Sequence, residues 1–80
     1  MRGPVTRTIE VDATGLSCPR PVLELAAAVS DAAIGDVIEL TATDPAARVD
    51  VPVWCRLQRH RLRSIDELGS GWRFTVERRR

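Results

Sequence analysis

The chain has 80 residues, 44% of them apolar and 29% charged, with a formal net charge of +1. This length allows one small domain with one hydrophobic core, spanning residues 1–80, and leaves no room for separate catalytic and cofactor-binding lobes. The composition excludes disordered, collagenous and membrane-spanning classes, and no run approaches the ~18 consecutive apolar residues of a membrane span. Every basic residue is an arginine, so catalysis through a Schiff-base lysine is also excluded.

Residues 1–5 contain no apolar stretch that could form the core of a secretory signal, which predicts a cytoplasmic location. In a reducing compartment the two cysteines, Cys18 and Cys55, are expected as thiols, although a disulfide between them stays open. Residues 1–47 hold three arginines against seven acidic residues (net −4), whereas residues 48–80 hold nine against four (net +5). The second part of the chain is therefore expected to form a basic surface.

Hydrophobic periodicity predicts a strand, a helix and a second strand in the first half of the chain. Residues 5–11 alternate between apolar and polar side chains, as in a half-buried strand, and residues 12–17 form a loop. From Pro19 the apolar residues follow helical spacing until Gly35, which predicts a helix of about fifteen residues. Residues 37–43 alternate again and predict the second strand, which ends at Asp44 and Pro45, a pair that favours a turn or a helix start.

The second half of the chain predicts a helix and a hairpin. The helix is expected to begin around residues 50–52, because Asp caps a helix well and Pro is tolerated in a first turn, and to run to about His60. Residues 62–67 and 72–77, separated by a glycine-containing turn, form the hairpin. The order βαβαββ predicts an α+β fold, a two-layer sandwich in which two helices pack on one four-stranded mixed sheet, with the first two strands parallel. Whether a second copy covers the far face of the sheet stays open.

The segment around the first cysteine contains residue choices that packing alone does not explain. Pro19 and Pro21 would break a helix interior but cost little in a first turn, so they are expected to start the helix and to place Cys18 at its N-cap. Ser, Thr, Asp and Asn cap helices better than Cys does, which indicates that the sulfur itself is required. The alternative is that Cys18 is a small buried apolar residue.

A cysteine at a helix N-terminus is expected to be reactive. The thiolate is the nucleophile, and helix N-termini lower the pKa of cysteine from about 8.5 toward ~3.5–7.5. Arg20 would add a nearby cation, and Gly15 would let the loop turn so that the sulfur projects at the edge of the protein. The sequence therefore predicts thiol chemistry at Cys18, with a lowered pKa.

The other candidate residues are expected to have structural roles. Cys55, beside Trp54 in the second helix, is interpreted as a packing residue, with a disulfide to Cys18 or a resolving thiol as alternatives. His60 is expected to cap or pack the end of that helix. No metal site is predicted, because the two cysteines and the histidine lack the paired spacing of zinc ligands.

These residues resemble a known family, the TusA-like (SirA-like) sulfur-carrier proteins, whose signature is a Cys-Pro-x-Pro motif that opens the first helix. The resemblance extends over residues 9–77. Family members linked to tRNA thiolation tend to carry Glu between the two prolines, where this chain has Arg20. The matching residues are Asp12, Gly15, Leu16, Cys18, Pro19, Pro21, Asp44, Pro45, Asp50, Val51, Pro52, Trp54, Cys55 and His60.

The resemblance implies a βαβαββ sandwich in which Cys18 accepts a sulfane sulfur as a persulfide and relays it to a partner, in tRNA thiolation, cofactor synthesis or sulfur oxidation. It implies a sulfurtransferase-type carrier rather than a stand-alone enzyme, with no cofactor, since the sulfur is carried covalently. The expected partners are a cysteine desulfurase or a rhodanese-like donor and a downstream sulfur-acceptor protein. The supporting motif residues are Gly15, Pro19, Arg20 and Pro21.

The basic second part of the chain indicates where such a partner would dock. Arg56, Arg59 and Arg63 are expected to form a docking face for an acidic partner. Exposed charges of this kind steer the encounter between two proteins.

Two further interpretations remain. One is a small RNA-binding module that would use the basic surface and the rings of Trp54, Trp72 and Phe74. Because Trp72 and Phe74 alternate like core residues, direct binding of nucleic acid is not expected. The other is a redox sensor that uses Cys18 and Cys55.

Overall fold

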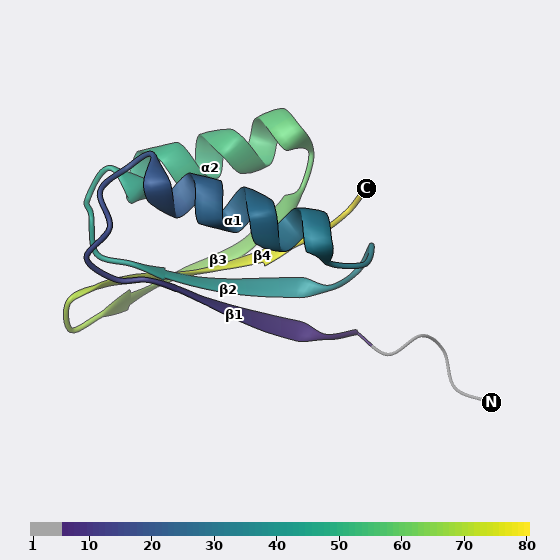
Figure 1. Cartoon of the computed structure of the whole chain (residues 1–80), viewed down its shortest axis with the longest axis horizontal. Coiled ribbons are helices and arrows are strands. Elements are labelled where there is room, and N and C mark those ends of the chain that lie inside the picture. Colours follow the sequence, from purple (N-terminus) through teal and green to yellow (C-terminus); the bar gives the residue numbers. More distant parts are fainter. Residues whose placement is uncertain (1–5) are drawn as a thin grey trace.

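The computed structural model describes residues 6–80, which form four strands and two helices in the predicted order (Figure 1). The elements are β1 (Thr8–Ala13), α1 (Arg20–Asp31), β2 (Val37–Ala42), α2 (Ala47–Gln58), β3 (Arg61–Leu68) and β4 (Gly71–Glu77). Neither helix within residues 6–80 is long and apolar enough to cross a membrane.

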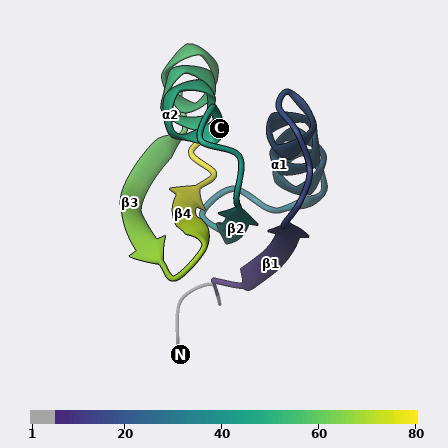
Figure 2. The ribbon, with the colours of Figure 1, turned by 90° about the vertical axis from the view of Figure 1, so that its left-hand side faces the viewer.

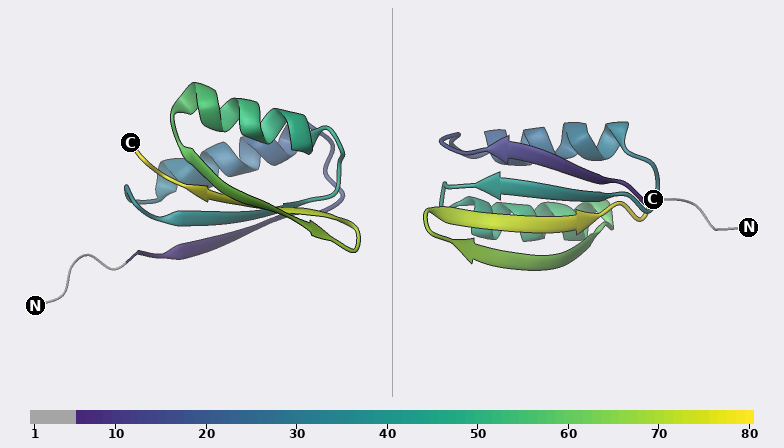
Figure 3. Two further views of the ribbon diagram at one scale, coloured as in Figure 1. Left: turned by 180° about the vertical axis from the view of Figure 1, so that it is seen from behind. Right: turned by 90° about the horizontal axis from the view of Figure 1, so that it is seen from below.

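The four strands form one mixed sheet in the order β1-β2-β4-β3. β1 and β2 are parallel, and β4 is antiparallel to both of its neighbours, as the view from below shows (Figure 3). Both helices lie on the same face of this sheet (Figure 2). The predicted two-layer α+β sandwich, with its first two strands parallel and a C-terminal hairpin, is confirmed.

The hydrophobic core lies between the helices and one face of the sheet. Alternate residues of the two central strands, such as Leu40 on β2 and Phe74 on β4, are fully buried. α1 contributes Leu25 and α2 contributes Val51, which are also fully buried. This strict alternation is why the strands can be recognised from the sequence.

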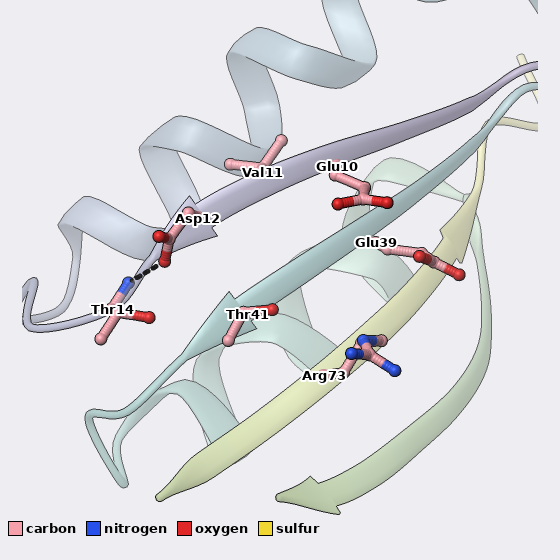
Figure 4. A pocket seen from close by; sticks show the side chains of 7 residues that line it. All are labelled: Glu10, Val11, Asp12, Thr14, Glu39, Thr41 and Arg73. Atoms are coloured by element: carbon pink, nitrogen blue, oxygen red, sulfur yellow. Dashed lines mark hydrogen bonds between the residues drawn. The ribbon is translucent and has the colours of Figure 1, made fainter.

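The opposite face of the sheet carries polar side chains. Figure 4 shows Glu10 on β1, Glu39 on β2 and Arg73 on β4, which together with Thr41 line a hollow on this face. The strand register pairs Glu10 with Glu39 and Thr41 with Arg73. An antiparallel or mixed sheet can leave one polar face in water, so this face does not need a second copy to bury it.

β1 and α1 differ at their ends from the prediction. Residue 5, where the first strand was expected to begin, lies outside the described residues, and β1 continues to Ala13 because its pairing with β2 continues to that point. α1 ends well before Gly35. The buried Asp36 accepts the N–H of Ala33 at 2.9 Å, and the Arg78 guanidinium donates to a carbonyl just beyond the helix. Asp36 is a local partner, whereas Arg78 comes from the far end of the chain and is not visible in a local pattern.

α2 begins at Ala47 rather than around residues 50–52, so Pro52 lies inside the helix instead of in its first turn. The turn before the helix is closed by Asp44, whose Oδ1 accepts the N–H of Ala46 at 3.0 Å. Beyond the last helical residue, Arg59 adopts a left-handed backbone with φ of 62°, which ends the helix.

Candidate functional site

Cys18 lies in the loop between β1 and α1, at the end of the molecule where both helices begin (Figure 1). The N-cap of α1 is Pro19 rather than Cys18. The N–H of Arg20 donates to the carbonyl of Ser17 at 2.9 Å, so this donor is already used. The predicted N-cap position of Cys18 is therefore wrong by one residue, although the two prolines do open the helix.

Gly15 turns this loop, as expected. Its φ of 79° lies in the left-handed region that favours glycine. The N–H of Gly15 donates to Oγ1 of Thr43 at 2.9 Å, which joins the loop to the end of β2. Of the other motif residues, Pro19 and Arg20 are exposed and Pro21 is buried.

The role of Asp44 in the site was missed, since the sequence reasoning treated it only as a signal for a turn or a helix start and as a residue of the family resemblance. Its Oδ2 accepts the N–H of Cys18 at 2.9 Å, while its Oδ1 holds the turn before α2. The carboxyl ends of parallel strands meet at one edge of a sheet. The residues after β1 and after β2 therefore had to be neighbours. The predicted parallel pairing of these strands was the signal that could have identified Asp44.

The surroundings of the Cys18 thiol disfavour the thiolate. Burial, a hydrogen bond to the Asp50 carboxylate and the negative charges of Asp50 and Asp44 raise the pKa of Cys18 to about 11. The Arg20 guanidinium is not among the groups that change the pKa of Cys18. The predicted lowering of the pKa is therefore wrong, because two carboxylates rather than a cation face the sulfur. At neutral pH, Cys18 of the free protein is a thiol.

Cys55 is a packing residue. It is 2% exposed, lies on the core side of α2, and is a free thiol like Cys18, so the alternative of a disulfide is not realised. Burial raises the pKa of Cys55 to about 11. A buried thiol of this kind is inert toward reagents in solution.

His60 packs at the end of α2, as expected. Its ring lies 5.5 Å from the ring of Trp54, and its Nδ1 accepts the N–H of Arg79 at 3.1 Å. Burial and the positive charges of Arg78 and Arg80 lower the pKa of His60. The imidazole is therefore a neutral packing and hydrogen-bonding group.

The three arginines expected to form a docking face do not share one surface. Arg56 and Arg59 are exposed at the C-terminal end of α2, away from the end of the molecule that holds Cys18 (Figure 1). Arg63 lies on β3, and its Nε is 3.9 Å from Oε1 of Glu77, on the polar face of the sheet. Their role in docking stays a prediction.

Exposed apolar side chains near Cys18 were also missed. Leu23 on α1 is 60% exposed, and Val49 and Val53 on α2 are 65% and 42% exposed. Leu23 and Val49 lie in the first halves of their helices, which begin on the same side of the molecule as Cys18, and Val53 lies at the middle of α2. Val49 and Val53 are four positions apart and so share a helix face. This spacing in the sequence could have indicated that the two valines form one apolar patch.

The aromatic residues do not form a stacking surface for nucleic acid. Phe74 is fully buried, and Trp72 is partly buried with the Arg48 guanidinium carbon 5.7 Å from its ring centre. Trp54 packs against the core and His60. The alternative of an RNA-binding module is therefore not supported.

Comparison with known proteins agrees with this fold. A family model described as Sulfurtransferase TusA matches residues 9–78. A protein named Sulfur carrier protein TusA from Pseudomonas putida is 35% identical over 69 residues, which is 86% of this chain and 86% of that protein. A protein of the same name from Pseudomonas paraeruginosa is 36% identical over 69 residues, covering 86% of this chain and 87% of its own.

A solved structure shares the fold. The crystal structure of the SirA-like protein from Desulfitobacterium hafniense gives a TM-score of 0.77 at 18% identity, and the match covers 90% of this chain and 99% of that chain. The two-layer fold and the family match define a small α+β protein with a motif cysteine before its first helix. The chain belongs to the TusA family.

Proposed function

We propose that this protein is a sulfur carrier that accepts a sulfane sulfur on Cys18 as a persulfide and relays it to a partner protein. The observation that carries the proposal is the position of Cys18. It stands in the Cys-Pro-x-Pro motif of a chain that matches the TusA family, on a loop that two hydrogen bonds join to the segment after β2. Cys55, the other thiol, is enclosed by the core.

The transfer needs no oxidant or reductant. The Cys18 sulfur attacks the terminal sulfur of a donor persulfide, a new S–S bond forms on Cys18, and the S–S bond of the donor breaks. The donor leaves as a thiolate and takes up the proton that Cys18 releases. Delivery to an acceptor repeats the same exchange in the opposite sense.

The partner supplies the activation of Cys18. With a pKa of about 11, only about one molecule in ten thousand carries the thiolate at pH 7. A cationic or basic group of the donor, placed beside Asp44 and Asp50, would offset the two carboxylates and lower this pKa in the complex. The free carrier would then remain unreactive until it meets its donor.

The exposed apolar residues Leu23, Val49 and Val53 suit a contact that forms and dissolves around Cys18. A cysteine desulfurase or a rhodanese-like protein is the donor that we propose, and a downstream sulfur-acceptor protein receives the sulfur. The pathway is tRNA thiolation, cofactor synthesis or sulfur oxidation. A cytoplasmic setting fits two cysteines that are both free thiols.

The test is to incubate the protein with a cysteine desulfurase and cysteine and to measure its intact mass. One additional sulfur atom is expected on the wild type, which reducing agent removes. Cys18→Ala should stay at its starting mass. Equal loading of wild type and Cys18→Ala would refute the proposal.

A further inference from the structure

Two consecutive residues after β2 hold the loop that carries the site cysteine. Thr43 Oγ1 accepts the N–H of Gly15 at 2.9 Å, and Asp44 Oδ2 accepts the N–H of Cys18 at 2.9 Å. The loop is thus attached at the turn after β1 and again at the cysteine itself. Side-chain bonds to backbone groups fix where a loop lies.

Asp44 uses its two oxygens for two different elements. Oδ2 takes the N–H of Cys18, just before α1, and Oδ1 takes the N–H of Ala46, just before α2. These two N–H groups also hold the pKa of Asp44 below its usual range, so the carboxylate stays ionised near neutral pH. One side chain therefore sets the position of Cys18 relative to the start of α2.

We propose that Asp44 is a positioning residue for sulfur transfer: by holding the N–H groups of Cys18 and Ala46 on its two carboxylate oxygens, it fixes the sulfur in the place where a donor persulfide meets it. This inference rests on the proposed carrier function. Exchange between two sulfur atoms requires the attacking atom to be aligned with the S–S bond that breaks.

Asp44 does not act by activating the Cys18 thiol electrostatically, because its charge has the wrong sign for that. The carboxylate opposes ionisation of Cys18, so it does not serve to make the thiol more nucleophilic. Asp44→Asn would remove this charge, but it replaces one of the two accepting oxygens by an NH2 group, so one of the two N–H groups would face a donor. The presence of Asp at this position is explained by the need for two acceptors.

Asp44→Asn should therefore change two rates in opposite directions. Alkylation of Cys18 by iodoacetamide at one fixed pH should become faster, since each unit of lowered pKa gives about ten times more thiolate. Sulfur transfer from a persulfide-loaded cysteine desulfurase should become roughly tenfold slower or more, because the sulfur is no longer held in position. Thermal unfolding is measured alongside to establish that both proteins are folded.

Asp44→Glu provides a second variant that keeps the charge. The longer side chain moves the oxygens, so both bonds cannot form in the same geometry. Transfer should fall as in Asp44→Asn, while the pH profile of alkylation should stay that of the wild type. A change that acts only through charge would leave this variant at the wild-type transfer rate.

Asp12→Asn is the matched control. Asp12 Oδ1, near the end of β1, accepts the N–H of Thr14 at 2.9 Å, so the substitution makes the same chemical change without touching the N–H of Cys18. Both rates should stay within about twofold of the wild type, as expected for a surface substitution remote from the reacting atom. Thr43→Val, which removes only the bond to Gly15, should lower the transfer rate less than Asp44→Asn does.

The outcomes are distinct. Transfer by Asp44→Asn that equals or exceeds the wild-type rate would overturn the proposal, whatever its alkylation rate. A parallel fall of both rates would also overturn it, because the loss would then lie in access to the sulfur. If the wild type itself is not loaded by any donor, the carrier function fails rather than the role of Asp44.

Discussion

The carboxylate of Asp50, in the first turn of α2, raises the pKa of the Cys18 thiol, before α1, through hydrogen bonding and its negative charge. This relationship links the starts of the two helices. Together with burial and the charge of Asp44, it keeps the sulfur protonated in the free protein. The ionisation of Cys18 is therefore set first by burial and then by the acidic groups Asp50 and Asp44 near the start of α2.

The alkylation rate of Cys18 should report this arrangement. Because only the thiolate reacts, the rate should rise with pH toward a half-point near the pKa of about 11. Asp50→Asn removes the negative charge beside Cys18 and should lower the pH at which alkylation is half-maximal. Arg20→Glu should leave it nearly unchanged. A wild-type half-point below that of a free cysteine would contradict the account.

Cys55→Ala should keep the function and lose stability. The free energy of unfolding should fall by about 1–2 kcal/mol, because a fully buried side chain loses its contacts. Persulfide loading of Cys18 should match that of the wild type. Denaturant unfolding and intact mass measure the two effects separately, and a loss of loading in a folded Cys55→Ala protein would revive the mechanisms that use two thiols.

Leu23→Ser should weaken the contact with the donor. Leu23 is 60% exposed near Cys18, so its loss removes apolar area from the proposed contact without opening a cavity in the core. The expected effect is a rise of several-fold in the KM for the carrier in a desulfurase assay. Ile34→Ser is the matched control, because Ile34 is 69% exposed and lies between α1 and β2. Equal effects of the two substitutions would remove Leu23 from the contact.

Charge reversal separates the two groups of arginines. Arg56→Glu combined with Arg59→Glu should slow transfer at low salt and have less effect at high salt, since exposed charges steer an encounter and are screened over roughly 8–10 Å. Arg63→Glu, on the other face of the sheet, should have no such effect. If none of these substitutions changes the rate at any ionic strength, the basic residues only make the surface more polar.

The fold was predictable because its signals are local. Alternation on the strands, helical spacing after Pro19 and the glycines of the hairpin turn each lie within a few neighbouring residues. The early start of α2 was not predicted, because Asp50 and Pro52 offered a competing local signal for a helix start, whereas the helix begins directly after the turn that Asp44 closes. The end of α1 is held in part by the Arg78 guanidinium, which comes from the other end of the chain.

The candidate site also has features that the local sequence reveals and features that it does not. The importance of Cys18 follows from the prolines beside it, which are visible in the sequence. The sign of its pKa shift does not, because the nearest charged neighbour along the chain is Arg20, whereas the groups that act on the sulfur are Asp50 and Asp44. These carboxylates reach Cys18 only after the parallel strands bring the two loops to one edge of the sheet.

The most direct test of the carrier role follows one sulfur atom through a complete cycle. The protein is loaded by a cysteine desulfurase with isotopically labelled cysteine, digested without reduction, and analysed by peptide mass before and after an acceptor thiol protein is added. The account predicts that the label sits on the peptide that contains Cys18 and leaves it when the acceptor is present. Label on the peptide of Cys55, or label on Cys18 that no acceptor removes, would contradict it.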